Sequence, residues 1–167
     1  MANGKQKIWV SDLIGEDYKR WHNEFVILDC GTACGKTYFC IRRLGKYAAT
    51  KKRRILYLCN RSKLRNQTYR QVKGEKLQAT IYVTTYQAFQ KKIQQGDKIP
   101  YYDYIIADEC HYFTTDAGFN DYTDVAYNSR KFFTLIVKQL RHIGIILVQS
   151  VTVLLFYFAC ISQILKK

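Results

Sequence analysis

The sequence predicts an α/β fold with a mostly parallel central sheet. Short runs rich in β-branched and aromatic residues alternate along the chain with stretches whose apolar residues recur at helical intervals. The composition agrees, because 167 residues at 48% hydrophobic and 24% charged are typical of one globular domain that buries a core. No internal repeat, low-complexity segment or linker interrupts the sequence, so we expect a single folded unit.

The expected strands and helices follow one another in turn. The strands are expected over residues 25–28, 55–59, 80–84, 104–107 and 143–148, and the helices over residues 37–49, 61–71, 86–94 and 124–141. This alternation is typical of parallel strands joined by crossover helices. Ligands bind such sheets at the carboxyl ends of the strands, so functional residues are expected there.

The charges indicate a polyanionic partner. The 27 Lys and Arg against 13 Asp and Glu give a formal charge of +14, which suits nucleic acid or an acidic membrane surface. Residues 41–73 include basic but no acidic residues, whereas residues 99–129 include acidic residues but no Lys or Arg. We therefore expect one basic face and one acidic site, although a basic run is also typical of a solvated helix face.

The first expected strand leads into a phosphate-binding loop. Cys30-Gly31-Thr32-Ala33-Cys34-Gly35-Lys36-Thr37 stands between this strand and a helix, as a Walker A loop does. Backbone N–H groups at such a helix start face phosphate, Lys36 reaches the β- and γ-phosphates, and the Thr37 hydroxyl ligates Mg²⁺. Cys30 replaces the usual first glycine. The expected nucleotide-binding residues are Gly31, Thr32, Ala33, Cys34, Gly35, Lys36, Thr37 and, from a later strand, Asp108.

The second and third expected strands end on polar residues. Leu58-Cys59-Asn60-Arg61 closes one strand and Thr84-Thr85-Tyr86-Gln87 closes the other. Hydroxyl, amide and guanidinium groups at strand ends suit contacts to a sugar-phosphate backbone. Helix caps and a solvated first helical turn are the alternative interpretation.

The fourth expected strand ends on two carboxylates. Tyr104-Ile105-Ile106-Ala107 leads into Asp108-Glu109, which has the form of a Walker B element. Asp108 would hold Mg²⁺ through its water shell, and Glu109 would position and deprotonate the attacking water. An acidic turn after the strand is the alternative.

The segments GTACGKT and DECH together resemble motifs I and II of the superfamily 2 helicases of the DEAD/DEAH-box class. The resemblance implies a three-layer, RecA-like P-loop NTPase lobe over residues 1–152, with ATP and Mg²⁺ as cofactors and Lys36 and Glu109 as catalytic residues. By similarity to motifs Ia and Ib, it implies that DNA or RNA, as a single strand or within a duplex, is contacted by Asn60, Arg61, Arg65, Thr85, Tyr86 and Gln87. His111 completes the DExH signature, and Ser150-Val151-Thr152 resembles motif III, so the expected coupling residues are His111, Ser150 and Thr152.

Helicases of this class use two lobes, and the resemblance covers one. The second lobe supplies an arginine finger that is worth orders of magnitude in rate. We therefore expect slow or undetectable hydrolysis by this chain alone, unless another chain supplies a second lobe in trans. A non-catalytic nucleic-acid-binding or regulatory module from a truncated helicase is one alternative. A membrane-anchored nucleotide-binding protein is another, favoured only by the apolar carboxyl-terminal segment.

The carboxyl-terminal segment allows two interpretations. Residues 143–165 contain no charged residue, which fits either a core strand followed by an apolar helix or a helix long enough to span a membrane. Residues 153–167 form an apolar tail that a truncated or frameshifted helicase would also carry. The amino terminus lacks a signal peptide, and we expect a cytoplasmic protein, membrane-associated only if this segment inserts. Accordingly, Cys30, Cys34, Cys40, Cys59, Cys110 and Cys160 are expected to be reduced.

Overall fold

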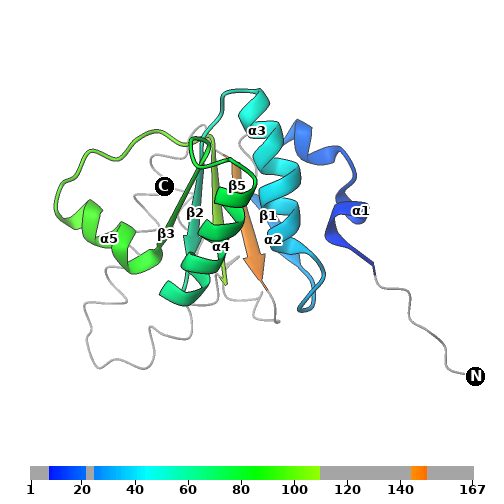
Figure 1. The fold of residues 1–167 in the computed structure, drawn as a ribbon, viewed down its shortest axis with the longest axis horizontal. Coiled ribbons are helices and arrows are strands. Elements are labelled where there is room, and N and C mark those ends of the chain that lie inside the picture. The colour runs from blue at the N-terminus through cyan, green and yellow to red at the C-terminus, as the bar shows by residue number, and fades with distance from the viewer. Residues whose placement is uncertain (1–7, 22–24, 110–143, 150–167) are drawn as a thin grey trace, which may run out of the picture.

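Five parallel strands form the central sheet. The computed structural model describes residues 8–21, 25–109 and 144–149 (Figure 1). The strands are β1 (Phe25–Asp29), β2 (Ile55–Cys59), β3 (Ile81–Thr85), β4 (Tyr104–Asp108) and β5 (Gly144–Gln149). They lie in the order β1-β5-β4-β2-β3, and each neighbouring pair is parallel. The predicted fold class is confirmed, and each strand lies within one residue of its predicted bounds.

The helices connect the strands. The segments α2 (Lys36–Tyr38), η2 (Phe39–Gly45) and α3 (Lys46–Thr50) follow one another directly after the phosphate loop, and η2 has wide π-type turns. They are followed by α4 (Ser62–Gly74) and α5 (Tyr86–Gln94). The short helices α1 (Val10–Ile14) and η1 (Asp17–Arg20) precede the sheet and were not predicted from the sequence. The helix expected over residues 124–141 lies outside the described residues.

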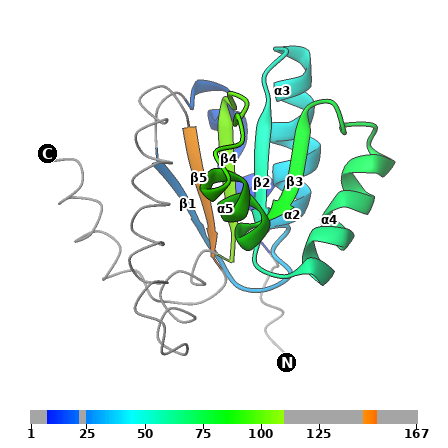
Figure 2. The same ribbon diagram turned by 90° about the vertical axis from the view of Figure 1, so that its left-hand side faces the viewer.

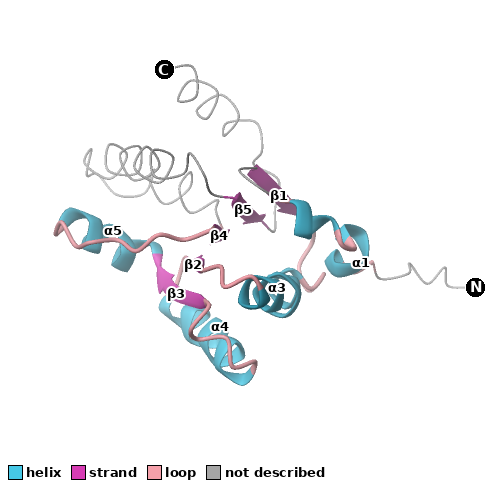
Figure 3. Cartoon of the chain, turned by 90° about the horizontal axis from the view of Figure 1, so that it is seen from above, coloured by secondary structure: helices cyan, strands magenta, loops and turns pink. Residues whose placement is uncertain are grey.

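Helices cover both faces of the sheet. Figure 3 shows α3 and α4 on one face and α5 on the other, while Figure 2 shows the strands side by side with α4 beyond β3. The buried side chains divide in the same way, since Tyr57 of β2 packs in one cluster and its neighbours Leu56 and Leu58 in the other. This alternation follows from the pleat of a strand whose two faces are both covered.

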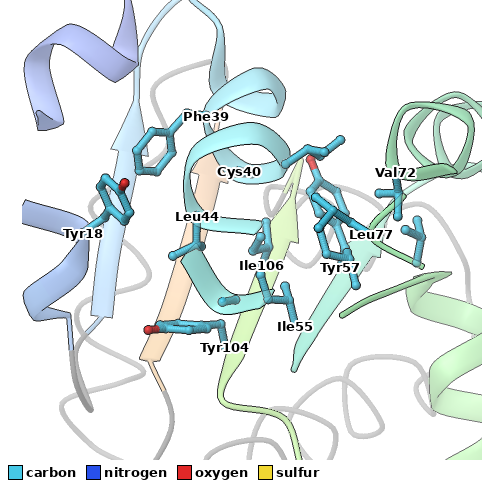
Figure 4. Close-up of a cluster of buried hydrophobic side chains, with 14 of the residues drawn as sticks. Tyr18, Phe39, Cys40, Leu44, Ile55, Tyr57, Val72, Leu77, Tyr104 and Ile106 are labelled. Atoms are coloured by element: carbon cyan, nitrogen blue, oxygen red, sulfur yellow. The ribbon is translucent and has the colours of Figure 1, made fainter. Parts of the chain in front are cut away.

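The larger core cluster supports the strands that carry the candidate site. Figure 4 shows Leu44 of the helix after the phosphate loop beside Ile55 and Ile106 of β2 and β4. Leu44, Ile55 and Ile106 are fully buried, as is Tyr57. Strands β2 and β4 are therefore packed together against the helix that begins at Lys36.

The first part of the charge-free segment, residues 144–149, forms strand β5 and not a membrane helix. Residues 144–149 pair in register with β1 on one side and β4 on the other, for example Ile145 with Phe25 and with Ile105. The beginning of the charge-free segment is thus a central strand of the sheet, as one interpretation predicted. Across the described ranges, no helix has the length and apolar character needed to cross a membrane. The apolar tail at 153–167 lies outside those ranges.

Candidate functional site

The phosphate loop joins the carboxyl end of β1 to α2, as the sequence predicted. Ala33 and Gly35 both have left-handed backbone conformations, with φ of 60° and 86°. A Cβ atom on Gly35 would also lie 2.9 Å from Cε3 of Trp9. Glycine is therefore required at position 35 both by its backbone angle and by the indole ring beside it.

Lys36 lies across this loop. Its Nζ donates hydrogen bonds to the carbonyl oxygens of Cys30 at 2.5 Å and Gly31 at 2.8 Å, and it lies 3.5 Å from the Sγ of Cys34. These contacts keep the ammonium group at the loop instead of extended into solvent. The ammonium thus lies at the start of the helix, where the backbone and the helix dipole favour an anion.

The amino-terminal segment packs against the phosphate loop. The backbone N–H of Val10 donates to the carbonyl of Cys34 at 3.0 Å, and the ring of Trp9 lies beside Gly35. Val10 is buried, whereas 43% of Trp9 is exposed. Sequence reasoning missed both residues, because no pattern in the first residues marks a segment that packs on a loop more than twenty positions away.

Asp108 ends β4 and is held by two tyrosines. The hydroxyl of Tyr57 donates to Oδ2 of Asp108 at 2.8 Å, and the hydroxyl of Tyr86 donates to its backbone carbonyl at 2.8 Å. Asp108 is only 6% exposed. The sequence analysis missed Tyr57, and the signal that could have revealed it is a polar hydroxyl within an otherwise apolar strand next to the carboxylate strand.

Burial controls the charge state of Asp108. It raises the pKa of this carboxyl from 3.8 to about 6, although the hydrogen bond from Tyr57 lowers it, the neighbouring charge of Glu109 raises it and the Lys36 ammonium lowers it. The phosphate loop and the end of β4 lie at the same carboxyl edge of the parallel sheet. At neutral pH the carboxyl is therefore mostly ionised and able to attract a cation.

Glu109 follows Asp108 in a strained conformation. Its φ of 54° is left-handed, which is rare for a residue with a Cβ atom and is often found at functional sites. The side chain is partly exposed, unlike that of Asp108. The chain turns at this point, so the two adjacent carboxylates lie in different environments, one buried and one reached by solvent.

The expected strand-contact residues lie at the ends of β2 and β3. These two strands are neighbours, with Cys59 opposite Thr85, so Asn60 and Arg61 lie at the same edge of the sheet as Gln87. Arg61 and Gln87 are exposed, and Asn60 and Arg65 are partly exposed.

Two of these residues have structural contacts. The Oγ1 of Thr85 accepts a hydrogen bond from the backbone N–H of Ala88 at 3.2 Å, which caps α5. Tyr86 is 2% exposed and directs its hydroxyl at Asp108, so its side chain offers little surface to a nucleic-acid strand. Tyr86, which the sequence resemblance gives as a strand contact, thus links the start of α5 to the end of β4. His111, Ser150 and Thr152 lie outside the described residues.

The cysteines of the described ranges are free thiols. Cys30 and Cys34 are partly buried in the phosphate loop, and Cys40 and Cys59 are buried behind it. The thiol of Cys34 donates to the carbonyl of Gly31 at 2.9 Å. Burial, together with a hydrogen bond to Cys34, raises the pKa of Cys30 to about 11, so this thiol stays protonated at neutral pH. Cys30 thus takes the first loop position as a small, uncharged group.

A cavity of about 400 Å³ adjoins Thr37, between the helix after the phosphate loop and α4. Glu75 at the end of α4 closes one side, because its carboxylate pairs with Arg42 at 2.7 Å and with Lys46 at 2.9 Å. The two ion pairs join the helix that begins at Lys36 to the helix that begins after Arg61. Elements from the two candidate sites are therefore connected directly.

The fold and the site together define a P-loop NTPase domain of the RecA-like type. The model of the family described as "Type III restriction enzyme, res subunit" (ResIII) matches residues 3–137. The chain belongs to this family, which comprises ATP-binding domains related to superfamily 2 helicases. The resemblance stated from the motifs is thereby confirmed at the level of family and fold.

Other comparisons give little further detail. Among curated proteins, none matches the sequence significantly. One similar solved structure is a KaiC-like protein from the hyperthermophilic archaeon Pyrococcus horikoshii OT3, with a TM-score of 0.47 and 17% sequence identity. The match covers 76% of this chain and 61% of that protein's chain.

Proposed function

We propose that the chain acts as the ATP-binding lobe of a DExH-type helicase, binding Mg-ATP at the carboxyl edge of the sheet and a nucleic-acid strand beside it. The observation that carries the proposal is the placement of Lys36, in the loop after β1, and of Asp108, at the end of β4, at the same carboxyl edge of the parallel sheet. A cation for phosphate at a helix start and a buried carboxylate for a metal at the same sheet edge suit a nucleoside triphosphate with its magnesium ion.

The proposed nucleotide contacts use the phosphate loop. Backbone N–H groups from Gly31 to Gly35 would face the β-phosphate, and Lys36 would exchange its bonds to the Cys30 and Gly31 carbonyls for bonds to phosphate oxygens. This exchange preserves the hydrogen bonds of the ammonium group. Binding of phosphate therefore requires movement of the Lys36 side chain but not of the loop backbone.

Thr37 and Asp108 fit a magnesium ion. Mg²⁺ in such sites keeps several water molecules and takes few protein ligands, together with phosphate oxygens. One hydroxyl and one buried carboxylate held by Tyr57 match that requirement. When bound, the ion neutralises charge on the β- and γ-phosphates.

Glu109 is the proposed general base. A partly exposed carboxylate next to the buried one can accept the proton of an attacking water, while Asp108 remains with the metal. The left-handed backbone at Glu109 directs the chain away from the strand at this residue. The two carboxylates thus take different roles in spite of their adjacency.

The proposed strand contacts are Asn60, Arg61, Arg65, Thr85 and Gln87. Their amide, guanidinium and hydroxyl groups are suited to phosphate and sugar oxygens. Tyr86 would act between the two sites, because its hydroxyl bonds to the backbone of Asp108. His111, Ser150 and Thr152 are proposed coupling residues on sequence resemblance alone.

A titration with fluorescent ATP tests the nucleotide site. Lys36→Ala is expected to weaken binding by roughly tenfold to a hundredfold, because a charge-assisted hydrogen bond contributes about 1.5–3 kcal/mol. Lys63→Ala, which removes the same charge from an exposed position on α4, is the matched control and should bind as the unaltered chain does. Equal affinities for the Lys36 variant and the unaltered chain would refute the phosphate-loop assignment.

A second experiment separates binding from hydrolysis. Glu109→Gln should keep its affinity for ATP and lose any turnover by roughly 10²–10⁴-fold, since an amide cannot accept the proton of water. If the unaltered chain binds ATP and strand without measurable turnover under any condition, the non-catalytic module becomes the better assignment. Unchanged turnover in the Glu109 variant would exclude this residue as the base.

The strand site is tested with single-stranded DNA and RNA. Arg61→Ala combined with Arg65→Ala should weaken strand binding and flatten its salt dependence by about 1.4 in logarithmic slope, because each phosphate contact on a single strand contributes about 0.7. ATP affinity should stay unchanged in this double variant. A strand affinity that does not change would place the strand elsewhere on the molecule.

A further inference from the structure

The sheet edge opposite the nucleotide site carries a column of two stacked tyrosines with a cationic side chain at each end. The guanidinium of Arg54 lies 5.2 Å from the ring centre of Tyr102, and the Tyr102 ring is stacked on Tyr82 with centres 6.4 Å apart and planes 20° apart. Lys92 continues the series, because its Nζ lies 5.2 Å from the ring centre of Tyr82 and 3.0 Å from its hydroxyl. We call Arg54, Tyr102, Tyr82 and Lys92 the amino-edge column.

The topology of the sheet assembles this column. Arg54 precedes β2, Tyr102 precedes β4 and Tyr82 is the second residue of β3, and these three strands are neighbours. The backbone N–H of Arg54 donates to Oδ2 of Asp103 at 2.7 Å, which joins the two strand starts. In Figure 1 the arrowhead of β5 points to the edge where the loop between β1 and α2 lies, so the parallel strands begin at the opposite edge.

The two cations of the column are exposed to solvent, whereas one of its two rings is buried. Arg54 and Lys92 are exposed, Tyr82 is 38% exposed and Tyr102 is 5% exposed. A hydrogen bond to the Tyr82 hydroxyl raises the pKa of Lys92 above its ordinary value, so this side chain is charged at any physiological pH. The rings therefore hold the two cations in fixed positions instead of leaving them as free surface chains.

The surroundings of the column are basic and aromatic. Tyr101, next to the column in sequence, is 57% exposed. Further exposed cations come from the turn before β2, from α5 and from the loop before β4; they are Lys51, Lys52, Lys91 and Lys98. The acidic residues in these segments are Asp97 and Asp103, and Asp103 already accepts a hydrogen bond from the backbone of Arg54. A positive field with exposed rings is thus characteristic of this edge.

A second arginine reaches the other face of the same edge. Arg53 donates to the hydroxyl of Tyr104 at 2.5 Å and lies 5.7 Å from the centre of that ring. Consecutive arginines therefore extend to opposite faces of the sheet, each fixed by a tyrosine. The basic edge is continuous around the strand starts and is not confined to one face.

We propose that this amino edge binds a single-stranded nucleic acid, independently of the proposed contacts at the carboxyl edge. A guanidinium already stacked on a tyrosine presents its other plane to a base, and an exposed tyrosine offers a stacking surface that accepts any base. The surrounding lysines supply phosphate contacts. Stacked rings with a cation at each end offer a base-stacking surface beside charges for phosphate, a combination that suits a single strand.

Fluorescence anisotropy with a labelled oligothymidylate of about 12 nucleotides, and its oligouridylate counterpart, tests the proposal, since such sites accept about 4–16 nucleotides. Arg54→Ala combined with Lys92→Ala should weaken binding about tenfold and reduce the salt slope by about 0.7, because the stacking surface of Arg54 and one phosphate contact of Lys92 are lost. Arg43→Ala combined with Lys73→Ala removes the same charge from exposed positions on other elements and should leave both quantities unchanged. Thermal melting checks that each variant is folded.

A second variant separates stacking from charge. Tyr101→Ser leaves the net charge unaltered and, at an exposed position, should leave the melting temperature unaltered, yet it should weaken strand binding about fivefold if a base stacks there. Polyglutamate of matched charge, added as a competitor, should displace the oligonucleotide from the unaltered chain far less effectively than unlabelled oligothymidylate does.

Two results would overturn the inference, and a third would support it over the proposed strand site. Unchanged strand affinity in the Arg54 and Lys92 variant, with binding abolished in the Arg61 and Arg65 variant, would confine the strand to the carboxyl edge and leave the proposed function intact. Equal displacement by polyglutamate would reduce the amino edge to a non-specific basic surface. Loss of binding only in the amino-edge variant would instead support this inference and contradict the proposed strand site.

Discussion

The ionised carboxylate of Asp108 lowers the stability of the folded chain. A carboxyl whose folded-state pKa is about 6, against an ordinary value of 3.8, binds protons more tightly in the folded chain than in the unfolded chain. Its contribution to folding is therefore fully present below pH about 4 and is lost as pH rises through about 6. Above that pH the fold carries the unfavourable free energy of a buried carboxylate, which a bound cation would offset.

Removing the buried charge with Asp108→Asn should therefore change the stability of the fold. Without magnesium and nucleotide, the variant should be more stable than the unaltered chain by up to about 3 kcal/mol at pH 8 and nearly equal to it at pH 4. Asparagine keeps an oxygen that accepts the Tyr57 hydrogen bond. Urea unfolding at the two pH values measures the difference, and a destabilised variant at pH 8 would show that the buried charge is well compensated in the fold.

Gly35 gives a second prediction at this scale. Gly35→Ala should weaken ATP binding, because a left-handed conformation costs about 1–2 kcal/mol for a residue with a Cβ atom and because the new methyl group would lie against Trp9. Combining it with Trp9→Ala should restore part of the affinity by removing the contact but not the backbone strain. Full affinity in the single variant would contradict the loop geometry described above.

At the scale of elements, the packing of β2 and β4 beneath the phosphate-loop helix holds the site. Ile106 is fully buried between Leu44 and Ile55 (Figure 4). We expect Ile106→Ala to destabilise the fold by about 2–5 kcal/mol through lost burial and a residual cavity. Ile8→Ala, at a position 61% exposed, should change stability by less than about 0.5 kcal/mol and serves as the control in chemical denaturation. Similar effects for the two variants would contradict this core assignment.

The strands could be predicted closely from sequence for a simple reason. Segments such as Ile55–Cys59 are continuous apolar runs because both faces of the sheet are covered, and they end at polar residues such as Asn60. The helix predicted over residues 86–94 is likewise confirmed. Thr85 caps its first turn, which is a local signal in the sequence. Local signals of this kind need no knowledge of the strand order.

Contacts between elements could not be predicted in the same way. The bond between Tyr57 and Asp108 exists because β2 lies beside β4, and the sequence does not state that β5 separates β4 from β1. The burial of Tyr86 depends on the same order, since its hydroxyl reaches the end of β4 from α5. The packing of Trp9 on Gly35 is likewise a long-range contact with no local pattern.

For the whole molecule, the formal charge of +14 predicts a strong salt dependence of nucleic-acid binding. Each phosphate neutralised on a single strand contributes about 0.7 to the slope of log affinity against log salt. If both sheet edges contact a strand, the unaltered chain should show a steeper slope than either the Arg61/Arg65 or the Arg54/Lys92 variant. Titrations from low to physiological salt measure this, and one slope common to all three chains would mean that neither edge carries phosphate contacts.

The central proposal is that this lobe binds Mg-ATP and a nucleic-acid strand and, as we expect, hydrolyses ATP only weakly by itself. The most direct test is ATP turnover by the purified chain, with and without single-stranded DNA or RNA, beside Glu109→Gln and a fluorescent-ATP titration of both. We predict that both chains bind ATP, that the unaltered chain turns it over slowly and that the variant does not. Absence of ATP binding by the unaltered chain, or rapid strand-stimulated turnover that persists in the variant, would contradict the account.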